Sequence, residues 1–146
     1  MKRNILLSGI AVVAFAVAAT AHEGVKNQVV KARMDGMAKL ASNMKILGQM
    51  AKGVIEFDAD QAQQAALGIS EEAAKIPVLF EADETDPKSE ALPVIWESYS
   101  DFIAKSDALV NVATDISKSI TEKTDLVPAM ASIGGSCSAC HKVYRQ

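Results

Sequence analysis

The chain has few of the residues that build β-sheets. Aromatic side chains make up 5% of its 146 residues, and no run of alternating apolar and polar residues marks a strand. It is instead rich in alanine, lysine, glutamate, methionine and leucine, which favour helix. We therefore predict an all-α fold.

An excess of basic charge is also lacking. Fifteen lysine and arginine residues face eighteen aspartate and glutamate residues, so the formal net charge is −3. A nucleic-acid-binding protein normally carries a basic patch or a high isoelectric point. We expect no nucleic-acid partner, and a surface that tolerates a basic protein better than an acidic one.

Only one long hydrophobic run is present, and it stands at the start of the chain. Lys2 and Arg3 precede an apolar stretch over residues 5–19, and residues 19–21 read Ala-Thr-Ala. This is typical of a signal peptide cut after Ala21. An uncleaved anchor is the alternative, but the run is short for a membrane span. We predict a signal peptide over residues 1–21, a mature domain over 22–146, and no membrane association after cleavage.

Four helical segments are predicted in the mature chain. They cover residues 24–52, about 58–75, 93–120 and about 125–145, with apolar side chains spaced three and four apart. Asp58 or Asp60 can cap the second helix and Pro77 can close it, while Pro93 can begin the third. Residues 76–92 are predicted to be a long crossover loop. The pattern favours an antiparallel four-helix bundle.

Cysteine is almost absent: the chain has two cysteines, and both lie in one short motif. Cys137, Cys140 and His141 form the pattern C-x-x-C-H, which in an exported protein indicates covalent attachment of a c-type haem. On a helix, residues three and four apart share a face, so both sulfurs can meet one edge of a flat macrocycle. His141 would then be the proximal iron ligand. The predicted cofactor is one haem c.

Three other interpretations of the motif are weaker. A zinc site would need a fourth ligand, and His22 is the only other histidine. A thioredoxin-like redox pair needs a strand before its helix. A plain disulfide gives His141 no role.

The second axial position of the iron decides the chemistry. A methionine thioether would fill it and suit electron transfer, whereas an apolar residue would leave the iron open to small gases. The candidates are Met34, Met37, Met44, Met50 and Met130. Periodicity does not choose between Met34 and Met37, and Met130 shares a helix with His141.

Several segments together resemble class II c-type cytochromes, the cytochrome c′ superfamily. The haem motif lies near the C-terminus, as in that family. The resemblance is carried by the runs RMDGM at 33–37, MKILG at 44–48, FD at 57–58, PVLF at 77–80, ALPVIW at 91–96 and CSACHKVYR at 137–145.

The resemblance implies a bundle with a haem between its helices. It implies that Cys137 and Cys140 bind haem and that His141 is the proximal ligand. The family's distal residue lies four after the first-helix arginine, which is Met37 here, so Met37 resembles the sixth ligand of the low-spin branch. Arg33 matches an arginine near a haem propionate, and Arg145 matches one near the proximal side.

These features lead us to expect a periplasmic electron carrier with a six-coordinate haem held by His141 and Met37. The alternative is a five-coordinate protein that binds nitric oxide or carbon monoxide. A haem enzyme ranks last, since the first helix offers no distal histidine or acid–base pair. We expect redox proteins as partners and a monomer or homodimer.

Overall fold

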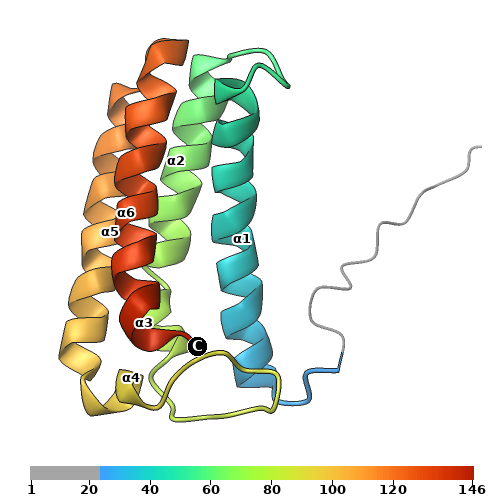
Figure 1. Ribbon diagram of the computed structural model, residues 1–146, viewed down its shortest axis with the longest axis vertical. Helices are drawn as coiled ribbons and strands as arrows, with labels where there is room; N and C mark the ends of the chain where they lie inside the picture. The colour runs from blue at the N-terminus through green and yellow to red at the C-terminus, as the bar shows by residue number, and fades with distance from the viewer. Residues whose placement is uncertain (1–23) are drawn as a thin grey trace, which may run out of the picture.

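Four long helices lie side by side in the computed structural model, which describes residues 24–146 (Figure 1). They are α1 (Gln28–Ala51), α2 (Ala59–Ala73), α5 (Tyr99–Ser119) and α6 (Leu126–Tyr144). Each runs antiparallel to the one before it (Figure 1). The predicted four-helix bundle is confirmed, and the predicted signal peptide lies outside the described residues.

Short polar side chains set where the first two long helices begin. The Asn27 side chain accepts hydrogen bonds from the amides of Val29 and Val30, so α1 begins at Gln28 rather than at residue 24. The Asp58 carboxylate accepts one from the Gln61 amide at 2.8 Å, which confirms its predicted role as the cap of α2.

The segment predicted as a loop begins with one short helix, and a second short helix follows directly after it. Helix α3 (Ile76–Leu79) includes Pro77 in its first turn, where a proline loses no hydrogen bond, so Pro77 does not close α2. Helix α4 (Val94–Glu97) begins after Pro93 as predicted, but the backbone breaks at Ser98 before α5 begins. The single helix predicted from residue 93 is therefore two helices.

The core is formed by one face of each long helix. The predicted face of α2 is buried, with Ile69 at 1% exposure. On α1 the apolar spacing also predicts Val29 in the core, but Val29 is 36% exposed and its neighbour Val30 is 1% exposed. Val30 lies three residues before the buried Arg33, so the two side chains share the inward face of α1.

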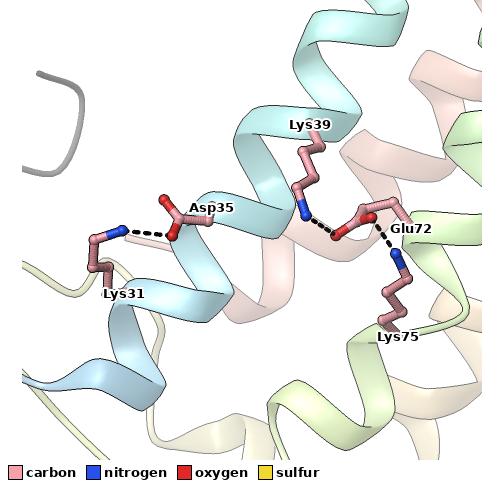
Figure 2. Close-up of polar contacts among 5 residues, drawn as sticks. All are labelled: Lys31, Asp35, Lys39, Glu72 and Lys75. Atoms are coloured by element: carbon pink, nitrogen blue, oxygen red, sulfur yellow. Dashed lines mark hydrogen bonds and ion pairs between the residues drawn. The ribbon is translucent and has the colours of Figure 1, made fainter. Parts of the chain in front are cut away.

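A small cluster of ion pairs connects α1 and α2 (Figure 2). The buried carboxylate of Glu72 on α2 forms ion pairs with two lysines. Its Oε1 lies 3.5 Å from the Nζ of Lys39 on α1, and its Oε2 lies 2.7 Å from the Nζ of Lys75. The hydrogen bond from Lys75 is the main cause that lowers the pKa of Glu72. Lys31 and Asp35 form a separate pair along α1, at 2.7 Å.

The crossover between α2 and α5 is tied to both ends of the described chain. The buried Asp86 carboxylate accepts hydrogen bonds from the amides of Lys26 at 2.9 Å and Asn27 at 3.0 Å, just before α1. Further along, the Leu92 amide donates to the carbonyl oxygen of Tyr144 at 3.0 Å, at the end of α6. The crossover therefore connects the start of α1 to the end of α6.

Within residues 24–146, each helix is too short or too polar to pass through a lipid bilayer.

Candidate functional site

A cavity of about 520 Å³ lies between α1, α5, α6 and the crossover. Most of its lining side chains are apolar, and its volume falls in the range of small-molecule and cofactor sites. From α6 it is lined by Cys137, Cys140 and His141. The residues of the predicted motif therefore border a cavity of suitable size.

Both cysteine thiols are free and half-buried at this cavity. No disulfide joins Cys137 to Cys140. Burial is the main cause that raises the pKa of each thiol. Both are therefore neutral thiols at neutral pH rather than metal-binding thiolates.

The imidazole of His141 lies on the exposed side of the same wall. Partial burial lowers its pKa, and the nearby positive charge of Arg145 lowers it further. A neutral imidazole is the form that ligates a metal. No protein hydrogen bond to its side chain occurs within residues 24–146, so its ring nitrogens are not engaged elsewhere.

Three methionines of α1 line the wall that faces α6. Met34, Met37 and Met44 all border the cavity. Met50 is 0% exposed in the core, and Met130 lies against Gly48, away from the cavity. The structure thus reduces the five candidate methionines to three and leaves the choice among those three open.

Arg33 is buried, with 2% exposure, and also lines the cavity. Its Nε donates to the carbonyl oxygen of Leu79 at 2.8 Å and its Nη1 to that of Glu84 at 2.7 Å, while Nη2 donates to that of Ala82. A contact with a haem propionate stays a prediction. The carbonyl partners were not predicted, because they lie more than forty residues away in the chain.

Arg145 lies at the open side of the cavity, where its Nε donates to Glu90 at 2.6 Å. Its predicted place near the proximal side also stays a prediction. Sequence reasoning missed Lys105 of α5, which lines the cavity and pairs with Asp101 at 3.4 Å. The spacing of four between these two residues was the available signal.

In the described part of the chain, no group of three or more histidine, cysteine or acidic side chains is placed to hold a metal ion by itself.

Comparison with known proteins agrees with this arrangement. The model of the family described as Cytochrome C′ matches residues 28–145. The chain belongs to the cytochrome c′ family. Among its relatives, a protein named cytochrome c-554 from Cereibacter sphaeroides is 34% identical over 82% of this chain and 81% of that protein.

Solved structures of the cytochrome c′ family have the same bundle. Cytochrome c′ from Rhodopseudomonas palustris superimposes with a TM-score of 0.76 at 28% identity, covering 83% of this chain and 98% of that one. A mutant of cytochrome c prime from Alcaligenes xylosoxidans, in complex with nitric oxide, gives 0.69 at 26% identity, covering 81% and 94%.

Membership of this family makes the protein a mono-haem c-type cytochrome with covalently attached haem c. The residues at the cavity fit that group, because two free thiols, an imidazole and several thioethers border a largely apolar space. These are the side chains that attach haem c and coordinate its iron in cytochromes c.

Proposed function

We propose that the protein is a periplasmic electron carrier whose haem has six-coordinate, low-spin iron. In this proposal Cys137 and Cys140 form the two thioether bonds, His141 is the proximal ligand and Met37 is the sixth ligand. The observation that carries the proposal is the meeting of this motif and the α1 methionines across one cavity. When bound, haem supplies an iron that takes up and releases one electron.

The geometry of α6 supports attachment at the two cysteines. Cys137 and Cys140 lie one turn apart on a single helix and line the same wall as His141. Their neutral thiols have no other covalent partner. The helix therefore presents both sulfurs and the imidazole to one bound group.

Support for Met37 comes from its place on α1. It is half-buried, lines the cavity and lies one turn after the buried Arg33, the position where the low-spin branch has its methionine. A thioether in the sixth position raises the reduction potential and closes the iron to outside ligands. This suits electron transfer rather than catalysis.

The lining also supports a role without catalysis. Among residues 24–146, His141 is the only histidine at the cavity. The α1 side chains that line the cavity are apolar apart from Arg33, whose guanidinium stays protonated, so they provide no acid–base pair. We infer that the protein is not an enzyme.

The Met37→Ala variant tests the proposed ligand. We expect the matured variant to lose its low-spin absorption bands and to bind carbon monoxide when reduced. Met34→Ala is the matched control, since it removes the same atoms from the same wall and should keep the low-spin bands. If Met37→Ala kept them and Met34→Ala lost them, Met34 would be the ligand instead.

A second candidate is a five-coordinate cytochrome c′ that binds nitric oxide or carbon monoxide. The observation that favours it is the likeness to the nitric oxide complex of the Alcaligenes protein. In that case Met37 would only pack over the iron. Ready binding of carbon monoxide by the unaltered reduced protein would select this candidate.

Location and partners follow from the same proposal. Haem c in an exported bacterial protein implies the periplasm, reached through a signal peptide cut after Ala21. We propose that other redox proteins exchange electrons with it and that it is a monomer or a homodimer.

A further inference from the structure

Arg33 makes an unusual set of contacts for a buried cation. No carboxylate of residues 24–146 forms an ion pair with its guanidinium; its Nε and both Nη atoms donate to the carbonyl oxygens of Leu79, Ala82 and Glu84. These three carbonyls belong to the last residue of α3 and to the turn that follows it. One side chain of α1 thus holds the backbone of residues 79–84.

The guanidinium also lies over two aromatic rings. Its central carbon is 4.8 Å from the centre of the Phe80 ring and 5.2 Å from that of Trp96. The indole nitrogen of Trp96 donates to the carbonyl oxygen of Phe80 at 2.9 Å, which fixes the two rings relative to each other. Cation–π contacts of this kind stabilise a desolvated arginine.

The contacts continue through aromatic rings to α6. Phe80 packs on Phe102 of α5 with ring centres 5.1 Å apart, and Phe102 meets the ring of Tyr144 edge-on at 5.2 Å. The Tyr144 hydroxyl then donates to Asp101 at 2.6 Å. We name this series, Arg33, Phe80, Phe102 and Tyr144, the end column.

The end column joins the helices that carry the proposed iron ligands. Arg33 lies one turn before Met37 on α1, and Tyr144 lies three residues after His141 on α6. All four members of the column line the cavity. They form one continuous wall at its end, from the distal helix to the proximal one.

We propose that Arg33 is a positioning residue that anchors residues 79–84 and the end column, and so sets the separation of α1 and α6 at the haem. The anchoring of the turn is independent of iron ligation. The effect on the sixth position rests on the proposed function, because it requires Met37 to be a ligand.

The chemistry of arginine distinguishes this role from a charge near a propionate. A planar guanidinium can donate to three carbonyls and contact the faces of two rings at once, which a lysine ammonium cannot do. A role that needs only positive charge would survive in Arg33→Lys. A role that needs the planar guanidinium and its several N–H donors would be lost in Arg33→Lys.

The test compares Arg33→Lys with the unaltered holoprotein in two measurements. The first is hydrogen exchange at the amides of Leu79 and Phe80, which donate to the carbonyl oxygens of Lys75 and Ile76 at 3.0 Å. We expect exchange there to become about tenfold faster or more. The second is carbon monoxide binding by the reduced protein, which we expect to appear or increase.

Lys45→Ala, an exposed change on the same helix, is the control and should alter neither measurement. If Arg33→Lys does not yield folded protein, Phe80→Leu keeps the charge and opens the end column, and it should show the same two changes. Unchanged exchange at Leu79 and Phe80 in the folded variants would overturn the proposal.

A Met37→Ala background separates this inference from the proposed function. If Met37 is the ligand, Met37→Ala already opens the iron, and adding Arg33→Lys should still speed exchange without a further change in coordination. If Met37→Ala leaves the spectrum unchanged, the ligand assignment fails while the exchange result still decides the role of Arg33.

Discussion

At the scale of single residues, the two cysteines carry the clearest expectation. If both form thioethers, haem should stay with the polypeptide after denaturation. We predict that the double variant Cys137→Ser and Cys140→Ser loses all denaturation-resistant haem. Haem staining of a denaturing gel together with intact mass would show this.

Ser138→Ala, between the two cysteines and exposed, is the matched control and should keep its haem. Haem retained by the double variant through denaturation would contradict attachment at these positions.

Glu72 gives a second prediction, on acid stability. Its pKa is lowered in the folded protein, mainly by the hydrogen bond from Lys75, so it binds protons less readily when folded than when unfolded. Its contribution is therefore complete above the ordinary glutamate pKa of about 4.3 and is lost as the pH falls through the lowered folded value. Both lysine partners are more than half exposed, so we expect Glu72→Gln to cost only about 0.5–1 kcal/mol at neutral pH.

Thermal unfolding of the unaltered protein and of Glu72→Gln across a pH series measures this contribution. The two curves should differ at neutral pH and converge in acid. A difference that grew as the pH fell would show that the sign is wrong.

Some features of the site could be predicted from the sequence and others could not. The haem motif could be predicted because its spacing is local, and three of five candidate methionines prove to line one cavity. The hydrogen-bond partners of Arg33 could not be predicted. A pattern along one helix shows that a residue faces inward, but not which distant carbonyl oxygens it contacts. Asp86 lies in the segment predicted as a crossover loop, yet it is buried and its carboxylate accepts hydrogen bonds from the amides just before α1.

At the scale of helices, packing of α2 should dominate stability. Ile69 is 1% exposed within the core, so Ile69→Ala removes buried apolar contacts and leaves a cavity. We predict a loss of about 2–5 kcal/mol in the free energy of unfolding. Chemical denaturation of the holoprotein would measure it.

Val54→Ala, at a site 66% exposed, is the control for this change and should lower stability by less than about 0.5 kcal/mol. Equal losses at the two positions would contradict the assignment of the core.

The spacing of apolar residues predicted the four long helices, but it did not predict all of the residues at which they begin and end. The face of α2 was predicted because its small apolar residues recur at helical spacing. The break at Ser98 has no proline or glycine to announce it, and Pro77 is as compatible with the start of α3 as with the end of α2. Such positions depend on tertiary contacts, such as the hydrogen bond from the Tyr99 hydroxyl to the carbonyl oxygen of Pro77 at 2.5 Å.

At the scale of the whole molecule, the proposal predicts a processed and exported protein. Expressed from the full sequence in a host competent in cytochrome c maturation, the protein should be recovered from the periplasmic fraction. Its intact mass should equal residues 22–146 plus one haem. A mass that included residues 1–21 would contradict cleavage after Ala21.

The central claim is that Met37 and His141 fill both axial positions of the iron. The most direct test is the visible absorption spectrum of the matured protein, oxidised and reduced, with and without carbon monoxide. We predict sharp low-spin bands that carbon monoxide leaves unchanged. Broad high-spin bands that shift with carbon monoxide would contradict six-coordinate ligation and point to a gas-binding cytochrome c′.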